Sequence, residues 1–349
     1  MKQTGSGPPH SHAHLLAWVA TLLSILVISA RAQSLRENAQ MIDSLVGELP
    51  VGLGALPDPP IPTDNQQTPQ KVELGKRLFF DKALSADRSI SCGSCHDPKK
   101  GLSDGRPHAV GFHGTVLRRH TPSIWNAAYN ASQFWDGRAA TLEDQATGPM
   151  SSPGEMNSPG ERELMQRLEA DSYYRAAFRG AFGESPTLRD VAKALAAFER
   201  TLIARDSRFD RYARGDKRAL TLHEKNGLVV FIGKGRCARC HNGPNFTDNK
   251  FQNIGAGQED DKGRFAVTAI ESDLGAFKTP SLRNVELHAP YMHDGSLPTL
   301  EAVIEYYDRG GDVRPDKSPF VMKVGMTEGE KRDLVRFLRA LTDRSAGAQ

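Results

Sequence analysis

Two short motifs of cysteine and histidine carry the most informative chemistry in this chain of 349 residues. Both are C-x-x-C-H pentapeptides, Cys92-Gly-Ser-Cys95-His96 and Cys237-Ala-Arg-Cys240-His241. Two thiols three positions apart can form thioether bonds to the two vinyl groups of one haem, which places the adjacent histidine beneath the ring as an axial iron ligand. The pattern therefore predicts two covalently bound haem c groups, with His96 and His241 as proximal ligands.

The same cysteines allow two other kinds of site, and their spacing disfavours both. These four are all the cysteines in the chain. A zinc ion bound by all four thiolates would leave two similarly placed histidines without a role. A redox-active dithiol needs no following histidine, and such dithiols rarely occur as two copies with no other cysteine. Haem attachment is the interpretation that uses every residue of both motifs.

Composition argues against several other classes of protein. Lys and Arg number 45 against 42 for Asp and Glu, so the net charge is only +3 and nothing indicates nucleic-acid binding. Charged residues make up 25% of the chain, which is typical of a globular protein rather than a membrane bundle. Apolar residues reach only 38%, a modest share that two large flat cofactors would explain by filling part of each core.

The first 32 residues have the pattern of an export signal. An apolar run over 15–29 follows a segment that contains Lys2, and Ala30-Arg31-Ala32 then offers the small-x-small pattern of a signal peptidase site. The run is short for a membrane span and has the length of a signal-peptide core. We expect cleavage and a periplasmic protein, with an uncleaved N-terminal anchor as the alternative. Covalent haem attachment outside the bacterial cytoplasm agrees with this.

Helices and long loops must position the two motifs. Apolar residues recur at spacings of three and four, which predicts helices over 71–80, 161–178 and 188–204. Capping residues predict three more, beginning after Thr221, Thr299 and Thr327 and ending near 232, 310 and 341. Between them lie Gly/Pro-rich loops over 91–160 and 233–298, each with one cysteine pair. Loops of this length are uncommon unless something organises them.

The expected fold is therefore all-α, with two c-type cytochrome domains, each wrapped around one covalent haem, and long Gly/Pro-rich loops. His96 and His241 are 145 positions apart, which leaves one haem for each half. The expected organisation is a signal peptide over 1–32, an extended lead-in over 33–68, an N-terminal haem domain over 69–215 and a C-terminal haem domain over 216–345.

Further motifs extend the pattern from about residue 72 to 341. They are Leu74-Gly-Lys-Arg-Leu-Phe-Phe-Asp81, Ile90-Ser-Cys-Gly-Ser-Cys-His96, Phe134-Trp-Asp-Gly-Arg138, Gly148-Pro149 with Glu155-Met156, Pro280-Ser-Leu-Arg-Asn284 and Ala289-Pro-Tyr-Met-His-Asp-Gly295. In content and order they resemble the bacterial di-haem cytochrome c peroxidases and the related MauG-type enzymes. That resemblance implies that the N-terminal haem reduces peroxide and the C-terminal haem relays electrons.

The resemblance also implies roles for three residues near the haems. Gln145 and Glu155 match the distal-pocket pair, with Glu155 as the acid/base, because peroxide must lose a proton from one oxygen and gain one on the leaving oxygen. The alternative for Glu155 is a solvated loop carboxylate. Trp135 matches the tryptophan that bridges the haems as an electron relay, and its alternative is an ordinary buried tryptophan.

The sixth ligand of each iron is the part in which family members differ. His113 aligns with the histidine that closes the resting N-terminal haem in enzymes needing reductive activation, although His108 and His120 lie nearby. On the C-terminal side, Tyr307 stands at the position where the peroxidases mostly have methionine. The MauG branch has a tyrosine at this position. A phenolate is a hard anionic ligand that lowers the reduction potential. The alternative ligands there are Met322 and Met326, with Tyr306 as a further candidate.

A calcium site between the domains is left open. In the stretch Arg119-His120-Thr121-Pro122, family members carry an asparagine at the position of His120. Imidazole is a poor calcium ligand compared with an amide oxygen. Backbone carbonyls near His288 and Pro290 could still contribute.

The resemblance implies hydrogen peroxide as substrate, a small periplasmic electron donor (a cytochrome c or a copper protein) and a homodimer. One alternative is a MauG-like enzyme that oxidises a partner protein through a high-valent state, which Tyr307 favours. Another is a di-haem electron carrier without catalysis. Gln145 and Glu155 argue against a carrier, because a carrier needs no proton shuttle beside iron.

Overall fold

The fold consists of helices joined by long irregular segments, as the computed structural model describes it for residues 31–346. Its helices are 31–44, α2 (Pro69–Phe80), α3 (Cys92–Cys95), α4 (Leu142–Ser151), α5 (Glu161–Ala170), α6 (Ser172–Phe182), α7 (Leu188–Glu199), α8 (Arg208–Ala213), α9 (Leu222–Ile232), α10 (Phe265–Thr268), α11 (Leu300–Asp308) and α12 (Glu328–Ala340). Short 3-10 turns are η1 (Pro50–Gly52), η2 (Lys82–Leu84), η3 (Pro98–Lys100), η4 (Phe112–Gly114), η5 (Ala127–Tyr129), η6 (Cys237–Arg239), η7 (Glu271–Asp273) and η8 (Val285–Leu287). Two strands, β1 (Phe251–Gln252) and β2 (Phe277–Lys278), pair antiparallel. The expected all-α fold with two haem domains is confirmed.

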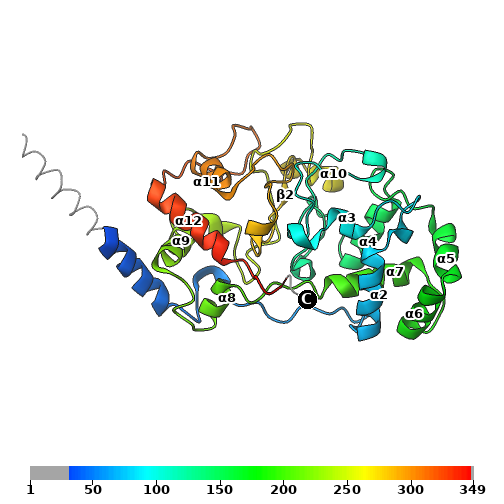
Figure 1. Cartoon of the computed structure of the whole chain (residues 1–349). Helices are drawn as coiled ribbons and strands as arrows, with labels where there is room; N and C mark the ends of the chain where they lie inside the picture. Colours follow the sequence, from blue (N-terminus) through cyan, green and yellow to red (C-terminus); the bar gives the residue numbers. More distant parts are fainter. Residues whose placement is uncertain (1–30, 347–349) are drawn as a thin grey trace, which may run out of the picture.

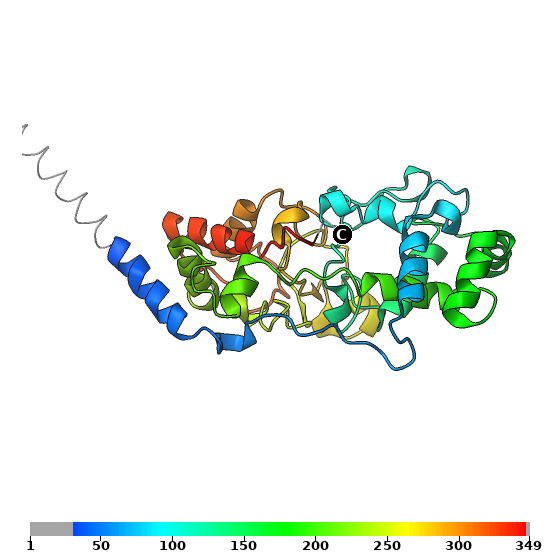
Figure 2. The same cartoon turned by 60° about the horizontal axis from the view of Figure 1, so that its bottom comes forward.

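The helices form two lobes that lie side by side (Figure 1). Helices α2 to α7 build the N-terminal lobe, and α8, α9, α11 and α12 build the C-terminal lobe; the lobes stay separate in the turned view of Figure 2. Each lobe has its own apolar core. The first contains Leu74, Leu78, Phe79, Phe178, Val191 and Leu195, and the second contains Phe209, Leu228, Phe231, Phe246, Leu334 and Phe337.

Both lobes contain a closely packed helix pair with a glycine where the helices meet. In the N-terminal lobe α2 packs on α7, and a Cβ on Gly75 would overlap the carbonyl of Ala194. In the C-terminal lobe α9 packs on α12, and a Cβ on Gly227 would overlap the carbonyl of Asp333. The absence of a side chain at these positions lets the backbones approach closely. The two lobes therefore each hold one helix pair together through a glycine at the crossing.

The segment predicted as one helix over 161–178 is two helices. Asp171 ends α5 with an extended backbone (φ −80°, ψ 122°) and begins α6, where its carboxylate accepts hydrogen bonds from the N–H groups of Tyr173 and Tyr174. Aspartate competes for nearby backbone donors in this way and so favours helix ends. The apolar spacing continues across the break, which hid it. In addition, α7 ends at Glu199 rather than at 204.

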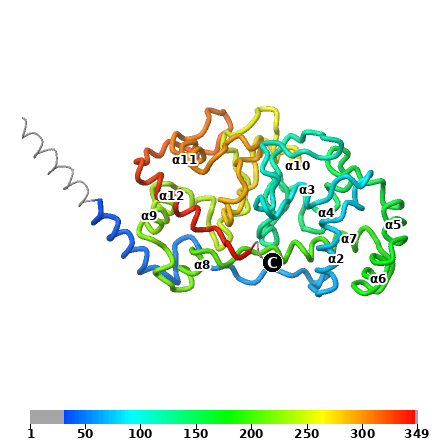
Figure 3. Tube along the Cα trace, viewed as in Figure 1, coloured from blue at the N-terminus to red at the C-terminus, as the bar shows by residue number. Residues whose placement is uncertain are grey.

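The lead-in predicted as extended over 33–68 begins with helix 31–44. Leu35, Ala39 and Ile42 recur at helical spacing along it, and Ala39 and Ile42 are buried. Beyond η1, residues 53–68 contain no regular element and run along the outside from the C-terminal lobe to the N-terminal lobe (Figure 3). The predicted signal peptide lies outside the described residues, apart from positions 31 and 32. No helix within 31–346 is long and apolar enough to cross a membrane.

The change from one core to the other occurs before the predicted domain boundary after residue 215. Phe209 and Tyr212 of α8 belong to the C-terminal core, as do Ile42, Leu49 and Leu53 of the lead-in. Packing therefore assigns α8 to the C-terminal lobe. The sequence could not place this junction, because a short helix carries no sign of the lobe against which it packs.

Candidate functional site

A cavity of about 1180 Å³ runs through the junction of the lobes, and both C-x-x-C-H motifs line it. The first cysteine pair lies on α3, whereas in the second pair Cys237 begins η6 and Cys240 directly follows it. All four thiols are free. The cavity thus brings the two predicted attachment sites into one continuous space.

Both motif histidines are held by a backbone carbonyl. Nδ1 of His96 lies 3.0 Å from the carbonyl oxygen of Leu102, and Nδ1 of His241 lies 3.1 Å from that of Phe246. Donation from Nδ1 leaves Nε2 free to bind a metal and fixes the orientation of the ring. Burial lowers the pKa of both imidazoles, which favours the neutral form that ligates iron.

The environment of the thiols argues against the alternative sites. Burial raises the pKa of Cys92 and Cys237 to about 12 and that of Cys95 and Cys240 to about 11. A redox dithiol or a metal thiolate relies on a lowered pKa instead. The part of the chain that the structure describes contains no group of three or more Cys, His, Asp or Glu suited to a metal ion, which removes the four-cysteine zinc site. The residues fit covalent haem.

Gln145 and Glu155 line the same cavity as the first haem motif. Gln145 is on α4, which begins where the Thr141 side chain accepts a hydrogen bond from the Asp144 N–H. Glu155 follows α4 in a loop held at both sides. Its N–H donates to the carbonyl of Ser152, and its own carbonyl accepts from the N–H of Phe112. The structure therefore brings the predicted distal pair and the first motif together.

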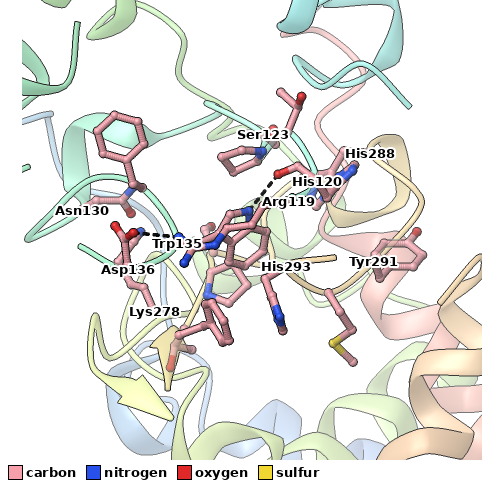
Figure 4. Close-up of a pocket in the computed structure, with 18 of the residues that line it drawn as sticks. Arg119, His120, Ser123, Asn130, Trp135, Asp136, Lys278, His288, Tyr291 and His293 are labelled. Atoms are coloured by element: carbon pink, nitrogen blue, oxygen red, sulfur yellow. Dashed lines mark hydrogen bonds and ion pairs between the residues drawn. The ribbon is translucent and has the colours of Figure 1, made fainter. Parts of the chain in front are cut away.

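Trp135 lies at the junction of the lobes (Figure 4). Its indole N–H donates to the carbonyl of His120 at 2.9 Å, and its own carbonyl accepts from the N–H of Lys278 in β2 at 2.8 Å. The ring of His293 lies edge-on at 6.4 Å between centroids. Trp135 is thus held by backbone groups from both lobes and lines the cavity that contains both motifs.

An ion-pair network fixes the segment that carries Trp135. Arg119 contacts Asp136 at 2.7 Å and Asp261 at 2.8 Å, so one guanidinium joins both lobes. Arg138 also contacts Asp136, at 2.9 Å. Bidentate pairing of a planar guanidinium with carboxylates is directional, so it holds Asp136, and with it Trp135, in one position.

Tyr307 and Met322 are the predicted C-terminal ligands that line the cavity. Burial raises the pKa of Tyr307, with the nearby thiols of Cys240 and Cys237 adding to the effect. The Met322 sulfur instead accepts a hydrogen bond from Arg236, and its side chain is half exposed. Tyr307 is therefore the better-placed candidate.

Two further C-terminal candidates do not line the cavity. Tyr306 turns away from it and donates from its hydroxyl to the carbonyl of Ile254 at 3.0 Å. Met326 is buried elsewhere, and its backbone N–H donates to Asp308.

His113 does not reach the cavity in this conformation. Its side chain is 69% exposed, with Nε2 3.2 Å from a carboxylate oxygen of Asp87 and its ring stacked on Phe112. A positive φ of 52° at His113 turns the ring outward. The prediction that His113 binds the N-terminal iron does not match this arrangement, and binding would require the loop to move.

His120 occupies the segment considered for calcium. It is 3% exposed, and its Nδ1 lies 2.6 Å from the carbonyl oxygen of Arg106 while Nε2 lies 3.3 Å from the Ser103 hydroxyl. An imidazole donor therefore bonds a carbonyl where a cation would need oxygen ligands. The expectation that this is a poor calcium site stays a prediction.

The buried cavity residues that were not among the predicted site residues include Glu199, Lys278 and His293. Glu199 directly follows the apolar stretch 194–198, and Lys278 lies between Phe277 and Thr279. A charged residue inside an apolar stretch is the signal that could have marked the first two. His293 belongs to a motif that was recognised but given no role.

Comparison with known proteins places the chain in a family. A family model described as di-haem cytochrome c peroxidase matches residues 69–218. The chain is 46% identical over 286 residues to the methylamine utilization protein MauG of Methylorubrum extorquens, covering 81% of each chain. It is 37% identical over 318 residues to the cytochrome c551 peroxidase of Pseudomonas aeruginosa, covering 87% of this chain and 89% of that one.

Solved structures agree. The crystal structure of a MauG-like protein associated with microbial copper homeostasis matches with a TM-score of 0.80 and 34% identity, covering 86% of this chain and 97% of that one. Fold and site together define an oxidoreductase with two c-type haem domains. The chain belongs to the di-haem cytochrome c peroxidase and MauG family.

Proposed function

We propose that this protein reduces hydrogen peroxide to water at its N-terminal haem. Electrons would come from a small periplasmic donor, a cytochrome c or a copper protein, through the C-terminal haem. The observation that carries the proposal is the presence of Gln145 and Glu155 in the cavity that also contains His96. The homodimer implied by the family resemblance and the export to the periplasm predicted from the N-terminal signal pattern belong to the same proposal.

The residues supply proton handling and orientation. Bound haem iron supplies the redox chemistry of the site. The Glu155 carboxylate takes a proton from one peroxide oxygen and returns it to the other as the O–O bond breaks. The Gln145 amide orients the peroxide by hydrogen bonding. Hydrogen peroxide, two electrons and two protons give two water molecules, so the overall reaction balances.

Trp135 connects the two haem sites in this proposal. Its indole N–H is held by the carbonyl of His120, a group that cannot accept the proton. An electron can therefore pass through the ring without a change in protonation at this hydrogen bond. The Arg119–Asp136 pair holds the neighbouring backbone in place during transfer.

The test is rapid mixing of the diferric and half-reduced holoprotein with hydrogen peroxide, followed by steady-state reduction with a reduced cytochrome c. We expect a fast spectral change at the N-terminal haem, and a decrease of about 100-fold in the rate for Glu155→Gln, the lower end of the usual contribution of acid–base catalysis. Glu161→Gln, at the exposed start of α5, is the matched control and should react like the wild type. A protein without any peroxide reaction would be an electron carrier.

A second function is favoured by Tyr307, namely oxidation of a partner protein. The tyrosine lines the cavity beside the second cysteine pair, and a relative of this chain is the methylamine utilization protein MauG. If Tyr307 ligates iron, Tyr307→Met should change the spectrum of the C-terminal haem and raise its reduction potential, whereas Tyr306→Phe should leave the spectrum unchanged. An unaltered spectrum in Tyr307→Met would remove the basis for this second function.

A further inference from the structure

Lys278 is a buried lysine whose side chain has no partner among the described residues. It lies on β2, is only 8% exposed and lines the cavity at the junction of the lobes (Figure 4). Burial alone, with no neighbouring charge, lowers its pKa to about 8. An ammonium group taken out of water without a counter-charge is costly, because nothing replaces its hydration.

The other buried lysine of the described chain shows the usual solution. Lys225 is 7% exposed, and its ammonium group lies 2.8 Å from the Asp43 carboxylate. No carboxylate plays this part for Lys278. The acidic residues of the junction, Asp136 and Asp261, are already paired with Arg119. Because residues 31–346 leave Lys278 without a partner, a group bound in the cavity is the candidate.

The cavity itself indicates the chemistry of that partner. It is lined by both haem-attachment motifs, and each bound haem would bring two carboxylate groups. Lys278 is followed by Thr279 and Pro280, which line the cavity together with His241, the second motif histidine. The Lys278 backbone N–H also donates to the carbonyl of Trp135. Lys278 thus lies between the attachment site of the C-terminal haem and the bridging tryptophan.

We propose that Lys278 pairs with a carboxylate of the C-terminal haem and so positions that haem against Trp135. The positive charge also favours the reduced haem, since the reduced state has one less positive charge than the oxidised state. Lys278 is a positioning residue and not a catalytic one. The proposal depends on the presence of two bound haems and is independent of any reaction with peroxide.

The test is a spectroelectrochemical titration of the holoprotein, combined with resonance Raman spectra of the haem carboxylate bending modes. In Lys278→Met the ratio of reduced to oxidised C-terminal haem at a fixed ambient potential should fall at least tenfold. This corresponds to a decrease of about 59 mV in the one-electron reduction potential. Its carboxylate mode should also shift. Lys278→Arg, which keeps the charge, should restore both properties toward the wild type.

Lys250→Met is the matched control, because Lys250 is an exposed lysine whose carbonyl bonds the N–H of Thr279 beside Lys278. It should leave the Raman mode unchanged. A pyridine-haemochrome assay must first count two haems in each variant. If Lys278→Met binds fewer than two haems, it is replaced by Lys278→Gln, which retains much of the side-chain length and a hydrogen-bond donor. A wild-type potential and Raman mode in a fully loaded neutral variant would overturn the proposal.

Because both readouts are taken without peroxide, they separate this proposal from the proposed function. A protein inert to peroxide could still show the Lys278 effect, and an active peroxidase could lack it.

Discussion

The carboxyl group of Glu199 lies at the end of α7, 6% exposed, where it lines the cavity. Burial raises its pKa to about 8, because the effect of burial is larger than the opposite effect of the Arg200 charge. Arg200 directs its guanidinium to Glu143 instead, at 2.7 Å. Glu199 is therefore a neutral acid at pH 7, able to donate a hydrogen bond inside the cavity.

This protonation predicts a specific dependence of stability on pH. The native protein holds a proton on Glu199 that the unfolded chain, with an ordinary glutamate pKa near 4.5, has released. Stability is therefore lost as pH rises from about 4.5 to about 8. Glu199→Gln removes this loss, so its thermal midpoint should exceed that of the wild-type holoprotein at pH 8.5 and match it at pH 4.5.

Glu184→Gln, an exposed glutamate on the same lobe, is the control and should show no pH-dependent difference from the wild type. Equal effects of the two substitutions across the pH range would contradict a buried neutral Glu199.

The haem motifs show which site residues a sequence can predict. His96 and His241 obey a local rule, since each follows its cysteines within five positions. Lys278 and Glu199 acquire their chemistry from burial by segments far away in sequence, so the apolar residues beside each are its one local sign in the sequence. Iron ligation by His113 stays a prediction, because the orientation of this side chain depends on a backbone turn and on Asp87, 26 positions earlier.

At the scale of elements, the crossing glycines are the positions that tolerate least change. Gly75 on α2 and Gly227 on α9 have backbone carbonyls where a Cβ would lie. Gly75→Ala should therefore lower the free energy of unfolding by about 1–3 kcal/mol, the usual effect of overpacking. Gly227→Ala should do the same in the other lobe. Denaturant unfolding of the holoprotein measures both effects.

Gly180 provides the matched control, because it lies within α6 with nothing near its Cβ position. Gly180→Ala should be neutral or should stabilise the protein by up to about 1 kcal/mol, since alanine favours helix. Destabilisation by Gly180→Ala as large as that of Gly75→Ala would show that helix crossing is not the cause.

Helix starts were more predictable than helix breaks. The capping residues Thr221, Thr299 and Thr327 each accept a backbone N–H at the start of a helix, as their sequence patterns predict. These patterns are local and need no partner. The break at Asp171 was missed because the apolar face continues through it, and the periodicity that reveals a helix cannot show where its axis turns.

At the scale of the whole molecule, the proposed electron transfer would depend on how firmly the lobes are joined, because the cavity and Trp135 lie between them. Two charged pairs cross the junction near each other. Arg119 binds Asp261, which is 6% exposed, and Arg118 binds Asp260, which is 71% exposed. Burial raises the pKa of Asp261, but hydrogen bonds from Arg119 and the Gly263 N–H outweigh this and keep it below its ordinary value.

Asp261→Asn should therefore loosen the junction, whereas Asp260→Asn should not. Loss of the largely buried pair Arg119–Asp261 should cost about 2 kcal/mol, which is less than the cost for a fully buried pair because Arg119 is 21% exposed. The exposed pair should contribute at most about 1 kcal/mol.

The lowered pKa of Asp261 predicts a dependence on pH. It adds stability above about pH 4, and this stability is lost as the pH falls through the pKa of Asp261 in the folded protein. The wild type should thus approach Asp261→Asn in stability at acid pH, and unfolding of the holoproteins at pH 7 and pH 3 measures this. A constant difference between them at both pH values would mean that the charge of Asp261 does not hold the lobes together, and that the close approach of β2 to Trp135 suffices.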